Sequence, residues 1–128
     1  MKRIALFILL ILAFTLTAEA QTCTKAVNIS VPAGTTVQLV ALVTGRTVNI
    51  CGFVITGDTL ATTAQFQTGT GTTCGTGTVN LTPALRLCDE CSIPFGGVTG
   101  YIRRGLVSNA VCLAAVTGVV TGLLLYDQ

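Results

Sequence analysis

Short runs of valine, isoleucine and threonine, separated by turn residues, recur along most of the chain. In the first such run, Val27, Ile29 and Val31 alternate with Asn28 and Ser30. Branched Cβ atoms suit a pleated sheet better than a helix, and turn signals about every ten residues are typical of a sandwich or barrel. The pattern predicts an all-β fold, an antiparallel β-sandwich of about eight strands.

The expected strands cover residues 26–31, 36–43, 47–56, 62–67, 79–87, 101–107, 110–116 and 119–126. The threonine- and glycine-rich stretch 68–78 is expected to be a flexible connection held by Cys74, and 92–100 a loop or short strand. Pro83 indicates that the strand 79–87 is an edge or contains a bulge. Segment 105–126 has no charge, so a transmembrane helix is the alternative there. Its β-branched residues favour two strands joined by a turn.

The first twenty residues have the order of a secretory signal peptide: Met1-Lys2-Arg3, an apolar run over 4–16, and Ala18-Glu19-Ala20 before Gln21. We therefore expect a signal peptide over 1–20 and one domain over 21–128. The alternative is an uncleaved anchor, but the apolar run is short for a membrane span. Cleavage predicts a secreted, periplasmic or extracellular protein with no remaining membrane span.

Charge is scarce in this chain. Lys2, Arg3 and Glu19 precede the cleavage site, so five of the seven basic and four of the five acidic residues remain, a net charge of +1. Such a balance offers no basic field for nucleic acid. A chain with 51% hydrophobic and 9% charged residues is expected to hide surface against a partner or against copies of itself.

The sequence contains no histidine, which removes the usual general base, the Ser-His and Cys-His nucleophilic pairs and the commonest metal ligand. Paired carboxylates are the remaining acid–base option. Of the candidates Asp58, Asp89, Glu90 and Asp127, only two are adjacent, and neighbours on a strand point to opposite faces. We therefore expect no enzyme activity, no cofactor and no metal.

Six cysteines follow residue 20, and an even number in a short exported chain indicates a disulfide framework: Cys23, Cys51, Cys74, Cys88, Cys91 and Cys112. The Cys88-Asp89-Glu90-Cys91 motif has three interpretations. It could be a redox pair, half of a zinc site with Cys74 and Cys112, or a structural disulfide closing a tight loop. The exported compartment favours the disulfide.

Several runs resemble small β-sandwich proteins of phage and environmental bacterial sequence sets. They are TTVQLVAL at 35–42, VNICGF at 48–53, GTGTTCGTG at 69–77, NAVCL at 109–113 and VTG at 116–118. The resemblance covers nearly the whole chain after the signal peptide and implies a jelly-roll-like sandwich with a structural or adhesive role. Relatives with four cysteines match Cys23, Cys51, Cys74 and Cys112, which marks Cys88 and Cys91 as an addition.

In a jelly roll the third and eighth strands are neighbours, so the implied fold predicts a cross-strand bridge between Cys51 and Cys112. Cys23 and Cys74 would then pair within the chain or each reach a neighbouring subunit. Tyr101, Arg103 and Arg104 form the only cationic cluster, a candidate contact for a carboxylate or a glycan.

Two functions fit these features. The first is a non-enzymatic structural or assembly protein, a virion-surface or extracellular filament-like subunit that binds copies of itself or another virion or cell-surface protein. In that hypothesis, 47–56 and 110–126 supply uncharged sheet edges, and Cys23 locks the contact covalently. The alternative is a secreted adhesin or carbohydrate-binding sandwich. The absence of tryptophan favours the first, because sugar-binding faces present aromatic platforms.

Overall fold

A computed structural model describes residues 22–89, 92–96 and 103–128 of the chain. Within these ranges the protein is all-β, with no helix. Its ten strands are β1 (Lys25–Val31), β2 (Thr36–Val40), β3 (Thr47–Gly57), β4 (Thr63–Thr70), β5 (Thr76–Asn80), β6 (Leu85–Arg86), β7 (Ser92–Gly96), β8 (Arg103–Val107), β9 (Ala110–Thr117) and β10 (Val120–Asp127).

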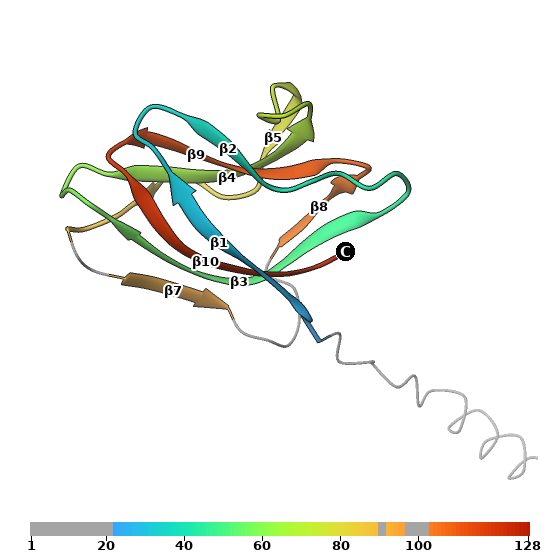
Figure 1. Cartoon of the computed structure of the whole chain (residues 1–128), viewed down its shortest axis with the longest axis horizontal. Coiled ribbons are helices and arrows are strands. Elements are labelled where there is room, and N and C mark those ends of the chain that lie inside the picture. Colours follow the sequence, from blue (N-terminus) through green and yellow to red (C-terminus); the bar gives the residue numbers. More distant parts are fainter. Residues whose placement is uncertain (1–21, 90–91, 97–102) are drawn as a thin grey trace, which may run out of the picture.

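The strands form two antiparallel sheets, which Figure 1 shows as two layers. The first sheet has the order β1-β10-β3, and β7 and β8 lie end to end along the far side of β3. The second sheet has the order β2-β9-β4, and β5 and β6 lie end to end along β4. Consecutive strands belong to different sheets at β1–β2, β2–β3, β3–β4, β6–β7, β8–β9 and β9–β10.

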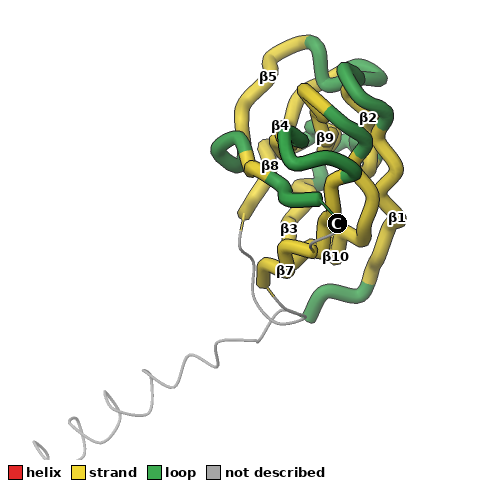
Figure 2. The backbone as a smooth tube through the Cα atoms, turned by 90° about the vertical axis from the view of Figure 1, so that its left-hand side faces the viewer, coloured by secondary structure: helices red, strands yellow, loops and turns green. Residues whose placement is uncertain are grey.

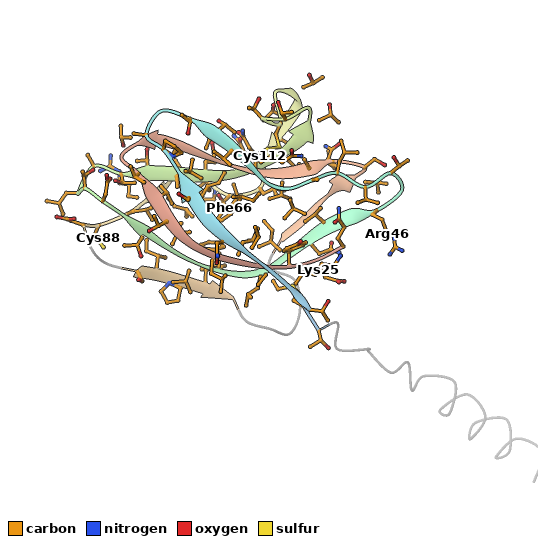
Figure 3. All side chains as sticks on the ribbon, viewed as in Figure 1. Lys25, Arg46, Phe66, Cys88 and Cys112 are labelled. Carbon is orange, nitrogen blue, oxygen red and sulfur yellow. A yellow bond between two sulfur atoms is a disulfide. The ribbon has the colours of Figure 1, made fainter. Side chains whose placement is uncertain are left out.

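The core lies between the layers and follows the two-residue period of the strands. In β4, Ala64, Phe66 and Thr68 are buried, whereas Gln65 and Gln67 are only partly buried. Phe66 contacts Phe53 of the opposite sheet, with 4.7 Å between ring centroids. Figure 3 shows the labelled Phe66 between the two layers. Each large side chain buried there stabilises the fold by about 1.5–3 kcal/mol.

The C-terminal segment confirms the strand interpretation over the transmembrane one. Residues 103–107, 110–117 and 120–127 are strands, and β10 lies between β1 and β3. The part of the chain that the structure describes has no helix long and apolar enough to cross a membrane.

Two expectations about the middle of the chain were wrong. Residues 68–78 are not one flexible connection, because β4 continues to Thr70 and β5 begins at Thr76. Residues 79–87 are not one strand either. Around Pro83, Leu81 N–H donates to the Phe66 carbonyl oxygen (2.8 Å), and Thr82 Oγ1 accepts from Phe66 N–H (3.1 Å). This satisfies the β4 backbone where strand pairing stops.

The interruption at Pro83 falls on an edge of the second sheet, as the sequence predicted for this proline. Strand β2 is also shorter than expected and ends at Val40 instead of continuing to residue 43. The described residues form ten strands rather than about eight, because β5 with β6, and β7 with β8, each divide one edge of a sheet.

Candidate functional site

Disulfides connect Cys23 to Cys51 and Cys74 to Cys112, with Cα–Cα distances of 6.3 and 6.1 Å. Cys88 is also disulfide-bonded, and none of the described cysteines is free. The predictions for Glu90 and Cys91 lie outside the described residues. The zinc interpretation of the Cys88 motif needed thiolates at Cys74 and Cys112, and their bond to each other contradicts it.

The predicted Cys51–Cys112 bridge is wrong. Cys51 lies on β3, whose neighbours in the first sheet are β10 and the β7–β8 edge, whereas Cys112 lies on β9 in the second sheet. The strand beside β3 is the last one of the chain, not the one that carries Cys112. Cys23 is bonded within its own chain as well, so it does not lock a contact with a neighbouring subunit.

The Cys74–Cys112 bond ties the tip of the β4–β5 hairpin to the outer face of the second sheet. Cys74, Ala110 and Cys112 form a small buried cluster there, separate from the main core. Gly69 makes room for the tip, because a Cβ at this position would lie 2.5 Å from the Cys74 carbonyl oxygen. Cys74 itself has a φ of 54°, a left-handed conformation uncommon for a residue with a side chain.

The outer faces of the two sheets differ in chemistry. On the second sheet, Gln38 and Gln67 are the cross-strand partners of Cys112, and Gln65 lies on the same face. On the first sheet, Leu123 is opposite Val54, and Val54 is opposite Pro94. Val54 and Leu123 are 41% and 38% exposed. The polar face needs no partner, whereas the apolar face leaves large hydrophobic side chains in water.

A shallow hollow lies within this apolar face. Leu125, Gly52 and Gly96 occupy one cross-strand row, so the glycines form a floor without side chains, and Pro94 and Leu123 stand in the next row. Gly96 has a φ of 82°, and a Cβ there would overlap the Cys51 carbonyl oxygen. Beside the hollow, Phe95 is 57% exposed and stacks on Phe53 with 5.6 Å between ring centroids.

We name Val54, Pro94, Leu123 and Leu125, with the Gly52–Gly96 floor, the outer apolar face. It was missed from the sequence, although a signal was present. Three consecutive leucines in β10, at 123–125, place apolar side chains on both faces of one strand. That pattern indicates a strand covered on both sides.

The predicted ligand contacts are only partly placed. Tyr101 lies outside the described residues, whereas Arg103 and Arg104 belong to β8 and are the Cα partners of Ile50 and Asn49. Asn49 Oδ1 is buried and has no hydrogen-bond partner, the one such side-chain atom among the described residues.

The acidic residues do not form one group. Asp58 is adjacent in sequence to Gly57, the partner of Val120 at the start of β10, whereas Asp127 lies at the other end of β10. The Asp58 carboxylate accepts hydrogen bonds from Val119 N–H (2.7 Å) and Thr62 Oγ1 (3.3 Å), so it holds a turn. The described residues contain no group of three or more His, Cys, Asp or Glu side chains placed to hold a metal ion.

The sheet edges are also not those predicted. Residues 47–56 and 110–126 form β3, β9 and β10, which are interior strands with a partner on each side. The edges of the first sheet are β1 on one side and β7 with β8 on the other. The edges of the second sheet are β2 and β5 with β6. These strands carry few charges because they are interior strands. Each is paired along both backbone edges, and its neighbours on both sides exclude water.

Comparison with protein-family models, with curated proteins and with solved structures finds no match for this chain, so the resemblance to phage and environmental β-sandwich proteins stays a prediction.

Proposed function

We propose that this protein is a non-enzymatic, exported structural subunit, of the virion-surface or extracellular-filament kind, that assembles with copies of itself. Its strand order supports the jelly-roll-like part of the proposal. If β5 with β6 and β7 with β8 each count as one interrupted strand, the sheets read 1-8-3-6 and 2-7-4-5. Eight strands in two facing sheets are the jelly-roll arrangement, which viral capsid and lectin domains share.

The observation that carries the assembly role is the outer apolar face. Val54 and Leu123 sit side by side on a surface without a charged neighbour in their row, since their cross-strand partners are Asn28 and Pro94. Exposed apolar side chains that are neighbours, rather than scattered singly, are the kind of surface that protein–protein contacts cover. A second copy supplies a surface of the same character, uncharged and apolar, so the face is complementary to itself.

The size of the face argues for multiple contacts. The face lies on three strands about 4.8 Å apart, over three residues of about 3.4 Å on each, and covers roughly 150 Å². A stable pairwise interface needs about 800 Å² per partner. The outer apolar face is therefore too small to hold two copies together alone, and it suits an assembly in which several weak contacts combine.

The disulfides support export. Covalent Cys23–Cys51 and Cys74–Cys112 bonds form and persist in oxidising compartments, and they are rare in the reducing cytosol. Export with cleavage predicts that intact-mass measurement of protein from the periplasm or medium finds a chain beginning at Gln21. A mass that retains residues 1–20 contradicts the cleavage.

Sedimentation velocity of the exported protein over a dilution series tests the assembly role. We expect concentration-dependent oligomers, and Leu123→Glu on the outer apolar face shifts them toward monomer. The matched control, Gln67→Glu, adds the same charge to the outer face of the second sheet and leaves the distribution unchanged. A monomer throughout the series overturns the proposal, and glycan binding by that monomer would identify a carbohydrate-binding module instead.

A further inference from the structure

The four sheet edges of this molecule differ in how they are protected from pairing with another strand. Charges, prolines and short lengths protect natural edges. On the first sheet, β7 contains Pro94 and β8 carries Arg103 and Arg104. On the second sheet, β5 and β2 have five residues each, and β6 has two, one of which is Arg86. Three of the four edges are therefore charged, interrupted or short.

Strand β1 is the exception. It has seven residues, its only backbone partner among the described strands is β10, and from Ala26 to Val31 it contains no charge, no proline and no glycine. Ala26, Asn28 and Ser30 are exposed along it. Figure 2 shows β1 at the rim of the molecule, on the side away from β7 and β8. An unprotected edge of this length presents unpaired N–H and C=O groups in the spacing of a strand.

Within the described part of the chain, the segments next to this edge are directed away from it. The Cys23–Cys51 bond carries the chain before β1 past β10 to β3, toward the middle of the first sheet. Lys25 Nζ lies 5.9 Å from the ring centroid of Tyr126 and 3.5 Å from the Gln128 carbonyl oxygen, so the one lysine of β1 leans on the end of the chain beyond β10. Neither the residues just before β1 nor Lys25 covers the free backbone edge of β1.

We infer that β1 pairs antiparallel with β1 of a second copy, which joins two first sheets across a two-fold axis. The inference rests on the proposed self-assembly and names its first contact. A two-fold contact uses the same strand on both copies. With the axis at Asn28, the midpoint of β1, Asn28 faces Asn28, Val27 faces Ile29, and Lys25 faces Val31. The two lysines then lie at opposite ends, so no like charges are opposed.

The pairing also brings the outer apolar faces of two copies onto the same side of one joined sheet. Each sheet presents the row Asn28, Leu123, Val54 and Pro94. Across the axis, the row from one copy continues through Asn28 into the same row of the other. The backbone ladder supplies the direction of the contact, and the joined sheet presents two apolar faces, one on each side of the Asn28 pair, to further copies.

Charge substitution at the axis tests the geometry. Asn28→Lys places two ammonium groups directly opposite each other, and Asn28→Asp does the same with two carboxylates. Like charges directly opposite are destabilising, so each variant alone should raise the dissociation constant of the dimer by about fivefold. An equimolar mixture of the two variants should restore or exceed wild-type affinity. Thr121→Lys is the matched control, because Thr121 is exposed on the same face but belongs to the interior strand β10.

A second measurement covers the case in which a charged variant fails to fold. Opposed residues of paired strands lie within the Cα–Cα range of a disulfide. Asn28→Cys should therefore yield a disulfide-linked dimer on a non-reducing gel after exposure to oxidised glutathione, whereas Thr121→Cys should not.

The outcomes separate this inference from the proposed function. Weakened single variants, rescue in the mixture and a cross-linked Asn28→Cys dimer support the β1 contact. If the wild type assembles and Asn28→Lys assembles as well as Thr121→Lys, the β1 contact is wrong and the structural role stands. If the wild type is a monomer, the structural role itself is overturned.

Discussion

Removal of the Cys74–Cys112 disulfide should destabilise this protein more than removal of Cys23–Cys51. The perturbation is Cys74→Ala with Cys112→Ala, compared with Cys23→Ala and Cys51→Ala. The two bonds close segments of similar length, with sequence separations of 38 and 28. When the losses of stability of the two double variants are compared, the loop-closure entropy that any disulfide contributes therefore largely cancels.

The chain-entropy part of each contribution can be worked from those separations. Loop closure in the unfolded chain gives about 3.9 kcal/mol for the longer loop and about 3.6 kcal/mol for the shorter one. The expected difference from this source is only about 0.3 kcal/mol. A larger difference must come from the folded state, where the two bonds have different surroundings.

In the folded state, the disulfide that closes the longer loop, Cys74–Cys112, is expected to contribute more to stability. Cys74 and Cys112 are both fully buried, and the bond holds a hairpin tip whose docking also uses the close approach of Gly69. Thr78 Oγ1 of β5 donates a hydrogen bond to the Cys74 carbonyl oxygen, the atom that Gly69 approaches, and so adds a second contact at the tip. Cys23, by contrast, is only partly buried at the start of the described chain.

Equilibrium urea unfolding of both double variants measures the two losses. We expect the Cys74–Cys112 pair to lose at least about 4 kcal/mol, and more than the other pair by well over the entropic difference. Equal losses, or a larger loss for Cys23–Cys51, would refute the argument that hairpin docking contributes to stability.

Three further predictions follow from the core and its turns, each measured by equilibrium unfolding. Phe66→Ala removes a fully buried ring that contacts the opposite sheet, and should cost about 3–5 kcal/mol. Gly118→Ala should destabilise the fold more than Gly45→Ala: both have a positive φ, but only at Gly118 would a Cβ overlap a neighbour, Thr62 Oγ1, so equal costs would contradict the predicted clash. Asn49→Leu should be neutral or stabilise by about 1 kcal/mol, because Oδ1 is buried without a partner; a large loss would mean that Asn49 has a partner in solution.

The strands could be predicted from the sequence because alternation and turn residues are local. Strand β1 is expected and found within one residue at its start, since Val27, Ile29 and Val31 face inward and Pro32 ends the run. The hairpin at 70–76 could not be predicted in the same way. Its threonines and glycines carry no inward pattern, and its structure depends on a covalent bond to Cys112, far away in sequence.

The predictions of the disulfide pairing and of the sheet edges were wrong for a related reason. Both depend on which sheet each strand joins, and that assignment is a property of the whole topology. Cys51 and Cys112 lie on equally apolar strands, and nothing in either strand records that β3 and β9 belong to different layers. The outer apolar face could in principle have been predicted from the sequence. Leu123, Leu124 and Leu125 break the alternation expected of a strand with one face in water.

The order in which copies associate follows from the two surfaces of the first sheet. One outer apolar face covers roughly 150 Å², well below the area of a stable interface. Pairing through β1 uses a ladder of backbone hydrogen bonds instead of that area, and it places two such faces, roughly 300 Å² together, on one side of the joined sheet. Stacking of two joined sheets then buries about twice the apolar area that stacking of single faces buries, so each further contact is stronger between dimers than between monomers. The second sheet has Gln38, Gln65 and Gln67 on its outer face and the disulfide-held hairpin tip over it, and its exposed Val79 lies on the edge strand β5. Dimers should therefore precede larger species, and larger species should contain even numbers of copies.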